Sequence, residues 1–160
     1  MLIVADASAF LNVFQFDFRH DIYYTTNSIL DEIIDFKNKM IIRQGMESGR
    51  LRLSEPSSES LELIKSKTVE LGLNLSKNDI SILALALDFK KEGKNFILQS
   101  DDYSMQNLAF HLKIPFKAVS QKGIQKEIRF VNACPVCGKE FQANERTCID
   151  CGVALARKKK

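Results

Sequence analysis

The chain has 160 residues, of which 45% are hydrophobic and 27% are charged. This is the balance of an ordinary globular protein, and it excludes collagen-like and low-complexity chains. No apolar run approaches the roughly 18 residues that cross a bilayer, and no basic segment precedes the first apolar run as in a secretory signal. We therefore expect a cytoplasmic protein with no membrane partner.

Short apolar strands alternate with helical patterns over the first 120 residues. The expected elements, in chain order, are a strand at 2–5, a helix at 8–14, a strand at 22–26, a long helix at 28–48, a strand at 51–56, helices at 57–72 and 75–93, a strand at 96–100, a helix at 102–112 and a strand at 116–119. Gly72 and Gly93 supply the glycine that commonly ends a helix. Strands separated by helices predict an α/β sandwich with a parallel sheet.

Acidic side chains follow two of the expected strands. Asp6 comes directly after the 2–5 strand, and Asp101 and Asp102 follow the 96–100 strand. In open α/β sheets the ligand crevice lies at the carboxyl ends of the strands, so these acids are candidates for a site. The alternative is a capping role, because aspartate is common at helix N-termini.

Two further acids lie on expected helices. Glu32 borders an apolar arc of the 28–48 helix and is the acid of this helix that we expect to approach the buried side, unless it is a boundary residue reaching solvent. The arc comprises Ile29, Leu30, Ile33, Ile34, Phe36 and Met40. Asp79 lies in the first turn of the apolar 75–93 helix, and the Ser76-x-x-Asp79 spacing is also that of a capping box.

Four acids from distant parts of the chain converge only if a cation lies between them, because clustered carboxylates repel one another. Hard divalent ions such as Mg²⁺ or Mn²⁺ prefer oxygen ligands and retain water. Such an ion lowers the pKa of water and offsets the charge that develops on a phosphate. The acids therefore indicate one or two catalytic Mg²⁺ or Mn²⁺ ions and hydrolysis of a phosphodiester.

All four cysteines lie close together near the end of the sequence. Cys134, Cys137, Cys148 and Cys151 have the spacing C-x2-C-x10-C-x2-C, and each pair is followed by glycine. Four thiolates suit one structural Zn²⁺ in a closed tetrahedral site, with no open position for catalysis. Two disulfides are the alternative, but they belong to secreted proteins. Because this segment has few large apolar side chains, we expect metal binding to provide its folding energy.

The charge is distributed unevenly. Residues 1–120 carry 14 basic and 16 acidic side chains, whereas residues 121–160 carry 9 basic and 4 acidic ones. This asymmetry indicates that the end of the chain meets a polyanion, unless it is a solubilising tail. We expect a domain at 1–120, a linker at 121–131, a zinc ribbon at 132–156 and a basic tail at 157–160.

Four motifs together resemble the PIN-domain nucleases. They are VADASAFL, TTNSILDE, NDISILALAL and LQSDDYSMQNLA, in that order within about residues 1–120. The resemblance implies a three-layer α/β/α fold whose acids bind Mg²⁺ or Mn²⁺ and cut single-stranded RNA. It implies that the metal-binding acids are Asp6, Glu32, Asp79 and Asp101. Asp102 is then an auxiliary acid, and Ser8 is a polar neighbour that places a water or metal.

A PIN domain followed by a zinc ribbon resembles the archaeal form of the Nin-one-binding (NOB) endonucleases. The segments QSDDYSMQN and CPVCG…CIDCG carry this resemblance. It implies a nuclease that matures the 3′ end of precursor small-subunit (16S) rRNA in the immature ribosomal subunit, where an assembly-factor protein is a further partner. The alternatives are a toxin-type PIN ribonuclease and a non-catalytic RNA-binding assembly factor.

Basic side chains of the second half are the candidates for RNA contact, because they neutralise phosphates. They are Lys122, Lys126, Arg129, Lys158 and Lys159. The alternative for the linker residues is a solvated helix face. Tyr103 is a weaker candidate for stacking on a base.

Overall fold

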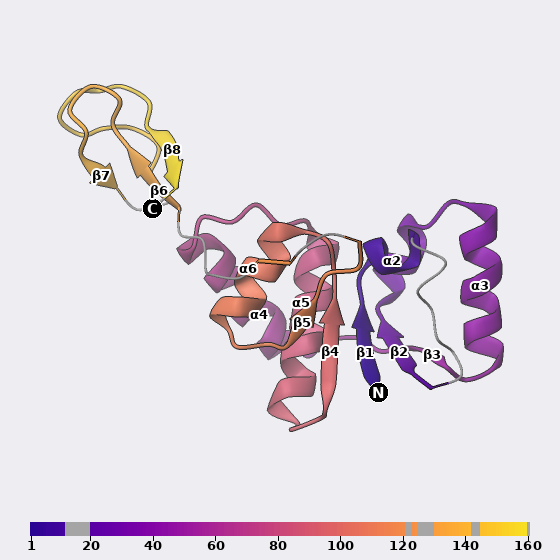
Figure 1. The fold of residues 1–160 in the computed structure, drawn as a ribbon. Helices are drawn as coiled ribbons and strands as arrows, with labels where there is room; N and C mark the ends of the chain where they lie inside the picture. Colours follow the sequence, from indigo (N-terminus) through magenta and orange to yellow (C-terminus); the bar gives the residue numbers. More distant parts are fainter. Residues whose placement is uncertain (12–19, 121–122, 125–129, 142–144, 160) are drawn as a thin grey trace.

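The computed structural model describes residues 1–11, 20–120, 123–124, 130–141 and 145–159 (Figure 1). Within these ranges a larger domain is built on a parallel sheet, and a smaller antiparallel sheet lies at the far end of the molecule, beyond helix α4 (Ser58–Glu70). None of the helices in the described part of the chain has the length and hydrophobicity of a membrane-spanning segment.

Five parallel strands form the sheet of the larger domain. They are β1 (Leu2–Ala5), β2 (Ile22–Thr25), β3 (Leu51–Leu53), β4 (Phe96–Gln99) and β5 (Phe116–Lys117). Their spatial order is β3-β2-β1-β4-β5, and all neighbouring pairs are parallel. The direction of winding therefore reverses between β1 and β4, and a ligand crevice opens at such a reversal, at the carboxyl ends of the two strands.

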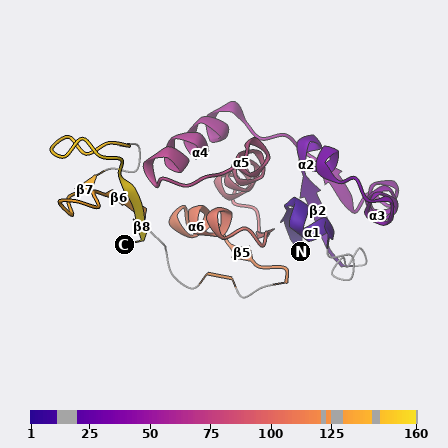
Figure 2. The same ribbon diagram turned by 90° about the horizontal axis from the view of Figure 1, so that it is seen from above.

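In the described part of the chain, six helices cover this sheet. They are α1 (Ala7–Leu11), α2 (Asn27–Glu32), α3 (Phe36–Glu47), α4 (Ser58–Glu70), α5 (Lys77–Lys91) and α6 (Tyr103–His111). Helix α5 contacts β1, β4, α4 and α6 and also touches α2, whereas α1 contacts β1, α2 and α3. Figure 2 shows α4, α5 and α6 gathered together, apart from α1, α2 and α3. Because crossovers are right-handed, the two groups belong to opposite faces of the sheet, which gives the expected three-layer architecture.

Helix α5 is the centre of the core. Residues 82–87 and Phe89 are all buried, as expected for a helix that is apolar on almost every side. The Phe89 ring packs edge-on against Tyr24 of β2 and Phe96 of β4, with centroid separations of 4.9 and 5.7 Å. The helix that carries Asp79 is thus held by the sheet on which Asp6 and Asp101 are placed.

Most expected elements lie within one or two residues of those observed. The strands expected at 51–56 and 116–119 are shorter, and the part of the 8–14 helix beyond Leu11 falls outside the described residues. The single helix expected over 28–48 is wrong. The chain leaves helical geometry at Ile33 (φ −86°, ψ 102°), and the Asp35 side chain accepts a hydrogen bond from the Asn38 N–H (3.1 Å) to start α3.

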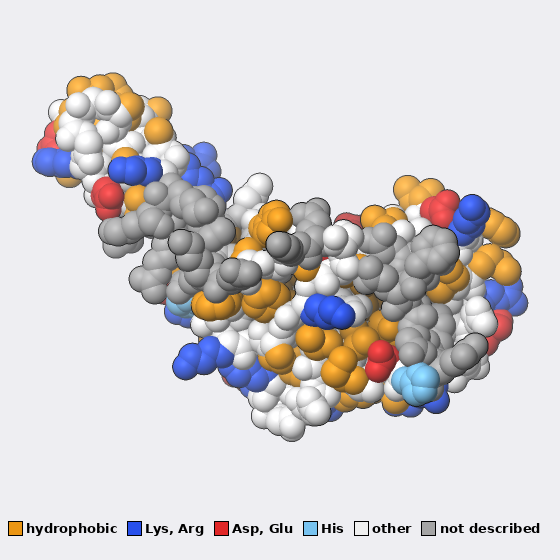
Figure 3. All heavy atoms as spheres, viewed as in Figure 1, with side chains coloured by type: hydrophobic (Ala, Val, Ile, Leu, Met, Phe, Trp, Pro, Cys, Tyr) orange, Lys and Arg blue, Asp and Glu red, His pale blue; other side chains and the backbone are white. Residues whose placement is uncertain are grey.

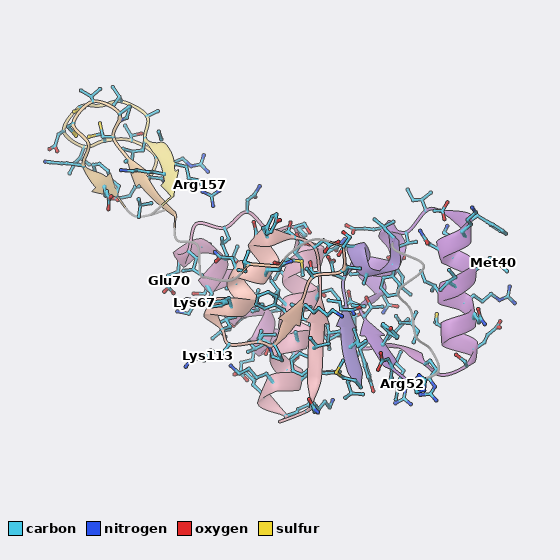
Figure 4. All side chains as sticks on the ribbon, viewed as in Figure 1. Met40, Arg52, Lys67, Glu70, Lys113 and Arg157 are labelled. Carbon is cyan, nitrogen blue, oxygen red and sulfur yellow. The ribbon has the colours of Figure 1, made fainter. Side chains whose placement is uncertain are left out.

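The apolar arc expected along that helix is also wrong. Ile29 and Ile33 are buried, but Ile34 is 84% exposed, and Phe36 and Met40 are exposed as well (Figure 4 labels Met40). The break rotates α3 relative to α2, so one helical projection cannot describe both. Glu32, the last residue of α2, is correspondingly exposed rather than directed at the buried side.

The smaller sheet comprises β6 (Phe130–Ala133), β7 (Glu140–Phe141) and β8 (Ala156–Lys159) in the antiparallel order β7-β6-β8. Residues expected in a basic tail instead form β8, because their backbone pairs with β6 along its whole length. Strand β6 likewise begins inside the expected linker. The Arg157 guanidinium, labelled in Figure 4, donates a hydrogen bond to the carbonyl oxygen of Gly72 after α4. This bond links the small sheet to the larger domain.

A core substitution tests this architecture. Leu98 of β4 is fully buried and pairs with Val4 of β1 and Phe116 of β5. We expect Leu98→Ala to lower the free energy of unfolding by about 2–5 kcal/mol, because it leaves a cavity. Val69→Ala on the exposed side of α4, where Val69 is 62% exposed, is the control and should change it by at most about 0.5 kcal/mol. Urea unfolding measures both, and equal effects would contradict the core described here.

Candidate active site and metal centre

Asp6 occupies the reversal point of the sheet. Its N–H donates to the carbonyl oxygen of Gln99 at the end of β4 (3.1 Å), so the two strand ends are joined at this residue. Its side chain is only 5% exposed. Carboxylate oxygen Oδ2 accepts hydrogen bonds from the hydroxyls of Ser100 (2.9 Å) and Ser8 (3.1 Å). Asp6 therefore lies at the carboxyl ends of β1 and β4, where the strand order predicts a ligand site.

The environment of Asp6 opposes its negative charge. Burial raises the pKa of the Asp6 carboxyl above its usual value, and the neighbouring carboxylate of Asp79 raises this pKa further, although the hydrogen bonds from Ser100, the Ala7 N–H and Ser8 oppose the shift. Among the described residues no basic side chain pairs with Asp6, Glu32 or Asp79. Among the described contacts of Asp6, hydrogen bonds alone stabilise its charge, and a cation bound beside it would stabilise this charge further.

Asp101 is joined to Asp6 through Ser8. The Asp101 N–H donates to the Ser8 hydroxyl (3.0 Å), which in turn donates to Asp6. The Asp101 carboxylate accepts hydrogen bonds from the Val119 N–H (2.7 Å) and from the N–H and hydroxyl of Ser120 (3.0 and 2.5 Å). These donors fix the carboxylate at the loop that follows β5.

Asp79 closes a capping box at the start of α5. The Ser76 N–H donates to Asp79 Oδ2 (2.7 Å), and the Asp79 N–H donates to the Ser76 hydroxyl (3.1 Å). The capping alternative raised by the spacing is therefore confirmed. It does not remove Asp79 from the site, because its charge acts on Asp6.

Glu32 reaches the same region through Asn78. The Asn78 side-chain amide donates to Glu32 Oε1 (2.5 Å). Since Asn78 directly precedes Asp79, this contact places Glu32 beside the first turn of α5, even though Glu32 itself is exposed. This contact joins α2 to α5, and the adjacent Asp79 is close enough to Asp6 to raise the pKa of that carboxyl.

The carboxylates are linked without being drawn into one tight cluster. In the described part of the chain, the four cysteines have ligand atoms that all lie within 4.8 Å of one another. The acids of this part of the chain do not form a group of three or more at this spacing. Asp102 is directed toward its own helix, where its Oδ1 accepts from the Met105 N–H (2.8 Å) and caps α6. Asp102 therefore has an observed capping role, as Asp79 does.

Sequence reasoning missed three polar residues of this region. Ser100 is buried and bonds Asp6, Asn78 bonds Glu32, and Ser120 bonds Asp101. The position of Ser100 directly after a strand was an available signal. No sequence pattern relates Asn78 to a partner 46 positions away.

The four cysteines form the second centre. Their sulfur atoms lie within 4.8 Å of one another, and the Cys137 and Cys148 sulfurs are 3.7 Å apart. Tetrahedral zinc with Zn–S bonds of about 2.3 Å separates its sulfur ligands by about 3.8 Å. The four cysteines are free, and a sulfur separation of 3.7 Å is far longer than a disulfide of about 2.05 Å. The group therefore fits zinc, and the disulfide alternative is wrong.

The two cysteine pairs are held by equivalent turns. The Gly138 N–H donates to the Cys134 carbonyl and the Gly152 N–H to the Cys148 carbonyl, both at 2.9 Å. Both glycines have positive φ, 74° and 68°, which side chains with a Cβ rarely adopt. In the first turn the Val136 and Cys137 N–H groups also donate to the Cys134 sulfur at 3.4 Å.

The thiols compete for negative charge. The hydrogen bond from the Cys137 N–H lowers the pKa of Cys134 to about 7. The contact between the Cys151 and Cys137 thiols raises the pKa of Cys151 to about 12. Four thiolates at this spacing repel, so full ionisation requires a cation among them.

Known proteins resemble both parts of this molecule. The sequence model of the family described as PIN domain of ribonuclease matches residues 3–89. The Endoribonuclease Nob1 of Methanothermobacter thermautotrophicus is 31% identical over 160 residues, which cover 98% of this chain and 92% of that protein. The chain belongs to the Nob1 family of endoribonucleases. The Nob1 proteins of Pyrococcus abyssi and Methanocaldococcus jannaschii are each 32% identical, over 94% and 97% of this chain and 89% and 76% of their own lengths.

Membership of the Nob1 family confirms the resemblance expected from the motifs, the PIN fold and a nuclease activity. Among the candidate RNA contacts, Lys122, Lys126 and Arg129 lie outside the described residues. Lys158 is exposed in β8, the strand to which Lys159 also belongs. Tyr103, at the start of α6, is exposed too.

The pKa of Asp6 gives a pH test. A carboxyl whose pKa is raised by folding binds its proton more tightly in the folded state, so stability falls as the pH rises from the unfolded-state pKa of about 3.9 through the folded pKa. In zinc-loaded protein without other divalent ions, we expect the stability of Asp6→Asn relative to the unsubstituted protein to increase over this interval and then level off. Thermal unfolding followed by circular dichroism measures it, and a constant difference would contradict the charge cost.

Zinc removal tests the cysteine centre. We expect a strong chelator to remove the protection of backbone amides in β6 and β8 from hydrogen exchange, because the metal supplies the folding energy there. Amides of β1 and β4 should stay protected. Cys151→Ser, which deletes one ligand, should reproduce the effect without chelator. Simultaneous loss of protection in both sheets would show that the two parts fold as one unit.

Proposed function

We propose that this chain is a Mg²⁺- or Mn²⁺-dependent endoribonuclease that hydrolyses single-stranded RNA and matures the 3′ end of precursor 16S rRNA in the cytoplasm. The observation that carries the proposal is Asp6, a buried carboxyl group at the sheet reversal that is repelled by Asp79 and has no described basic partner. Membership of the Nob1 family supports the same activity.

The proposed metal ligands are the carboxylates of Asp6, Glu32, Asp79 and Asp101, which hold one or two ions. Carboxylate oxygens are the ligands that hard divalent cations prefer, and the uncompensated charge at Asp6 fits such a cation. When bound, Mg²⁺ or Mn²⁺ lowers the pKa of water and neutralises charge that develops on the phosphate.

The chain's own residues orient these carboxylates. Ser8 and Ser100 both bond Oδ2 of Asp6, and the Ala7 N–H is a third donor to its carboxyl group. Val119 and Ser120 hold Asp101 from the other side, and Ser8 couples Asp101 to Asp6. Asp102 is an auxiliary acid in this proposal and not one of the four metal ligands, because its Oδ1 is engaged in capping α6.

The four cysteines hold one structural Zn²⁺ in the proposed holoenzyme, and they leave no position open for catalysis. Within this proposal residues 1–120 form the nuclease domain, and the zinc ribbon expected at 132–156 extends to include all of β6 and β8, from Phe130 to Lys159. Figure 3 shows basic side chains on the side of the ribbon that faces the nuclease domain. Arg157 of β8 is labelled there in Figure 4, and Lys158 of the same strand is exposed. Lys158 and Lys159, with the linker residues Lys122, Lys126 and Arg129, are the proposed phosphate contacts, and Tyr103 is a proposed base contact.

The proposed partner is the immature small ribosomal subunit, with its precursor rRNA and an assembly-factor protein. An acidic nuclease domain binds RNA poorly by itself, so the basic second half supplies the electrostatic attraction. This division explains why both parts occur in one chain.

A cleavage assay tests the proposal. Zinc-loaded protein is incubated with Mn²⁺ and an RNA fragment that spans the 3′ end of the small-subunit rRNA. We expect cleavage at one position, and a loss of at least about 100-fold in rate for Asp6→Asn and Asp101→Asn, because each removes charge from the ion site. Denaturing gels read the products.

Two other outcomes would contradict the proposal. Cleavage at many unrelated positions would indicate a toxin-type PIN ribonuclease. Binding without cleavage would indicate a non-catalytic assembly factor. Glu62→Gln on the exposed side of α4 is the matched control, and it should cleave like the unsubstituted protein.

A further inference from the structure

We propose that Asn78 is a positioning residue that orients the Glu32 carboxylate for a divalent cation. This inference rests on the proposed function, since it assumes that Glu32 is a metal ligand. It assigns a role to a residue for which the sequence predicted none, and it follows from the way in which α2 ends.

Glu32 is poorly placed to hold its own side chain. It is the last residue of the six-residue helix α2, because the chain becomes extended at Ile33. The C-terminal end of a helix carries partial negative charge, which disfavours a carboxylate there. The side chain is also exposed, so packing does not select one rotamer. An external contact is therefore needed to order it.

Asn78 supplies this contact from α5. Its Nδ2 donates to Glu32 Oε1 (2.5 Å) and is 3.4 Å from the Ser28 carbonyl oxygen, so it meets both the side chain and the backbone of α2. Oε1 is thereby fixed, and Oε2 has no bond to this amide.

The chemistry of the donor matters. An amide orients a carboxylate without cancelling its charge, whereas a lysine or arginine at this position would form an ion pair and compete with the cation. Among the described residues no basic side chain pairs with Glu32. Asn78 thus preserves the negative charge that a metal ligand needs.

The place of Asn78 in the helix sets the geometry. It lies between the N-cap Ser76 and Asp79, within the turn closed by the capping box. The same rigid turn therefore carries one proposed ligand, Asp79, and the group that positions another, Glu32. The two acids are 47 positions apart in the sequence, and this turn fixes the position of one relative to the other.

The test measures Mn²⁺ binding directly, by electron paramagnetic resonance of free Mn²⁺ in zinc-loaded full-length protein without RNA. We expect Asn78→Ala to raise the Mn²⁺ dissociation constant about tenfold, because residues that orient metal ligands contribute on this scale. Asn78→Ser, whose hydroxyl is too short to span the contact, should behave alike. Asn74→Ala, an exposed asparagine just before α5, is the control and should bind Mn²⁺ normally. Thermal melting should be unchanged in all three.

Cleavage kinetics provide a second readout. If Asn78 positions a ligand, saturating Mn²⁺ should restore most of the maximal rate of Asn78→Ala, and the KM for RNA should not change. A loss of maximal rate that excess Mn²⁺ does not restore would overturn the positioning role.

Glu32→Gln separates failure of this inference from failure of the proposed function. We expect it to weaken Mn²⁺ binding, and we expect Asn78→Ala to add nothing in the double variant. If Glu32→Gln weakens binding but Asn78→Ala does not, or if the two effects multiply, the inference is wrong and the metal site stands. If Glu32→Gln leaves Mn²⁺ binding unchanged, Glu32 is not a ligand, and both this inference and that part of the proposed function fail.

Discussion

Uncompensated negative charge at the sheet reversal is the constraint on which the rest of the nuclease domain depends. The order β3-β2-β1-β4-β5 brings the ends of β1 and β4 together, and Asp6 is buried at their junction. Two hydroxyls and a backbone N–H stabilise its charge only in part, since burial and Asp79 still raise its pKa. In the described part of the chain, the contacts of the Asp6 carboxylate are hydrogen bonds and not ion pairs. Its negative charge therefore favours binding of a cation.

In the proposed holoenzyme the two kinds of metal site differ in ligand type. Soft thiolates gather in the small sheet at distances that suit zinc, whereas hard carboxylate oxygens are distributed over four elements of the large domain. The cysteines are already within bonding reach of one ion, and their turns are fixed by glycines. The acids are engaged by hydrogen-bond donors that an ion would have to share. One centre is thus suited to permanent structure and the other to exchangeable binding.

Much of this organisation could be predicted from local patterns. Strand alternation, the Ser76 cap and the cysteine spacing depend on neighbouring residues, and each was confirmed. The long helix at 28–48 failed because core packing of Ile33 and capping by Asp35 overrode a continuous helical pattern. Contacts between distant segments, such as that between Asn78 and Glu32, leave no periodic signal in a single sequence. The fold was therefore more predictable than the network that orients the candidate site.

The capping box of α5 has a mechanical consequence. Asp79 is tied to the Ser76 backbone, so its carboxylate moves with the helix axis and not as an independent arm. Because that axis is clamped by the ring contacts of Phe89 near the opposite end, a small tilt caused by a repacked core would be transmitted as a displacement of an acidic oxygen. Helix α5 thus connects the apolar packing around Phe89 at one end to the Asp79 carboxylate at the other. Variation deep in the hydrophobic layer would then tune ion affinity without altering any charged group.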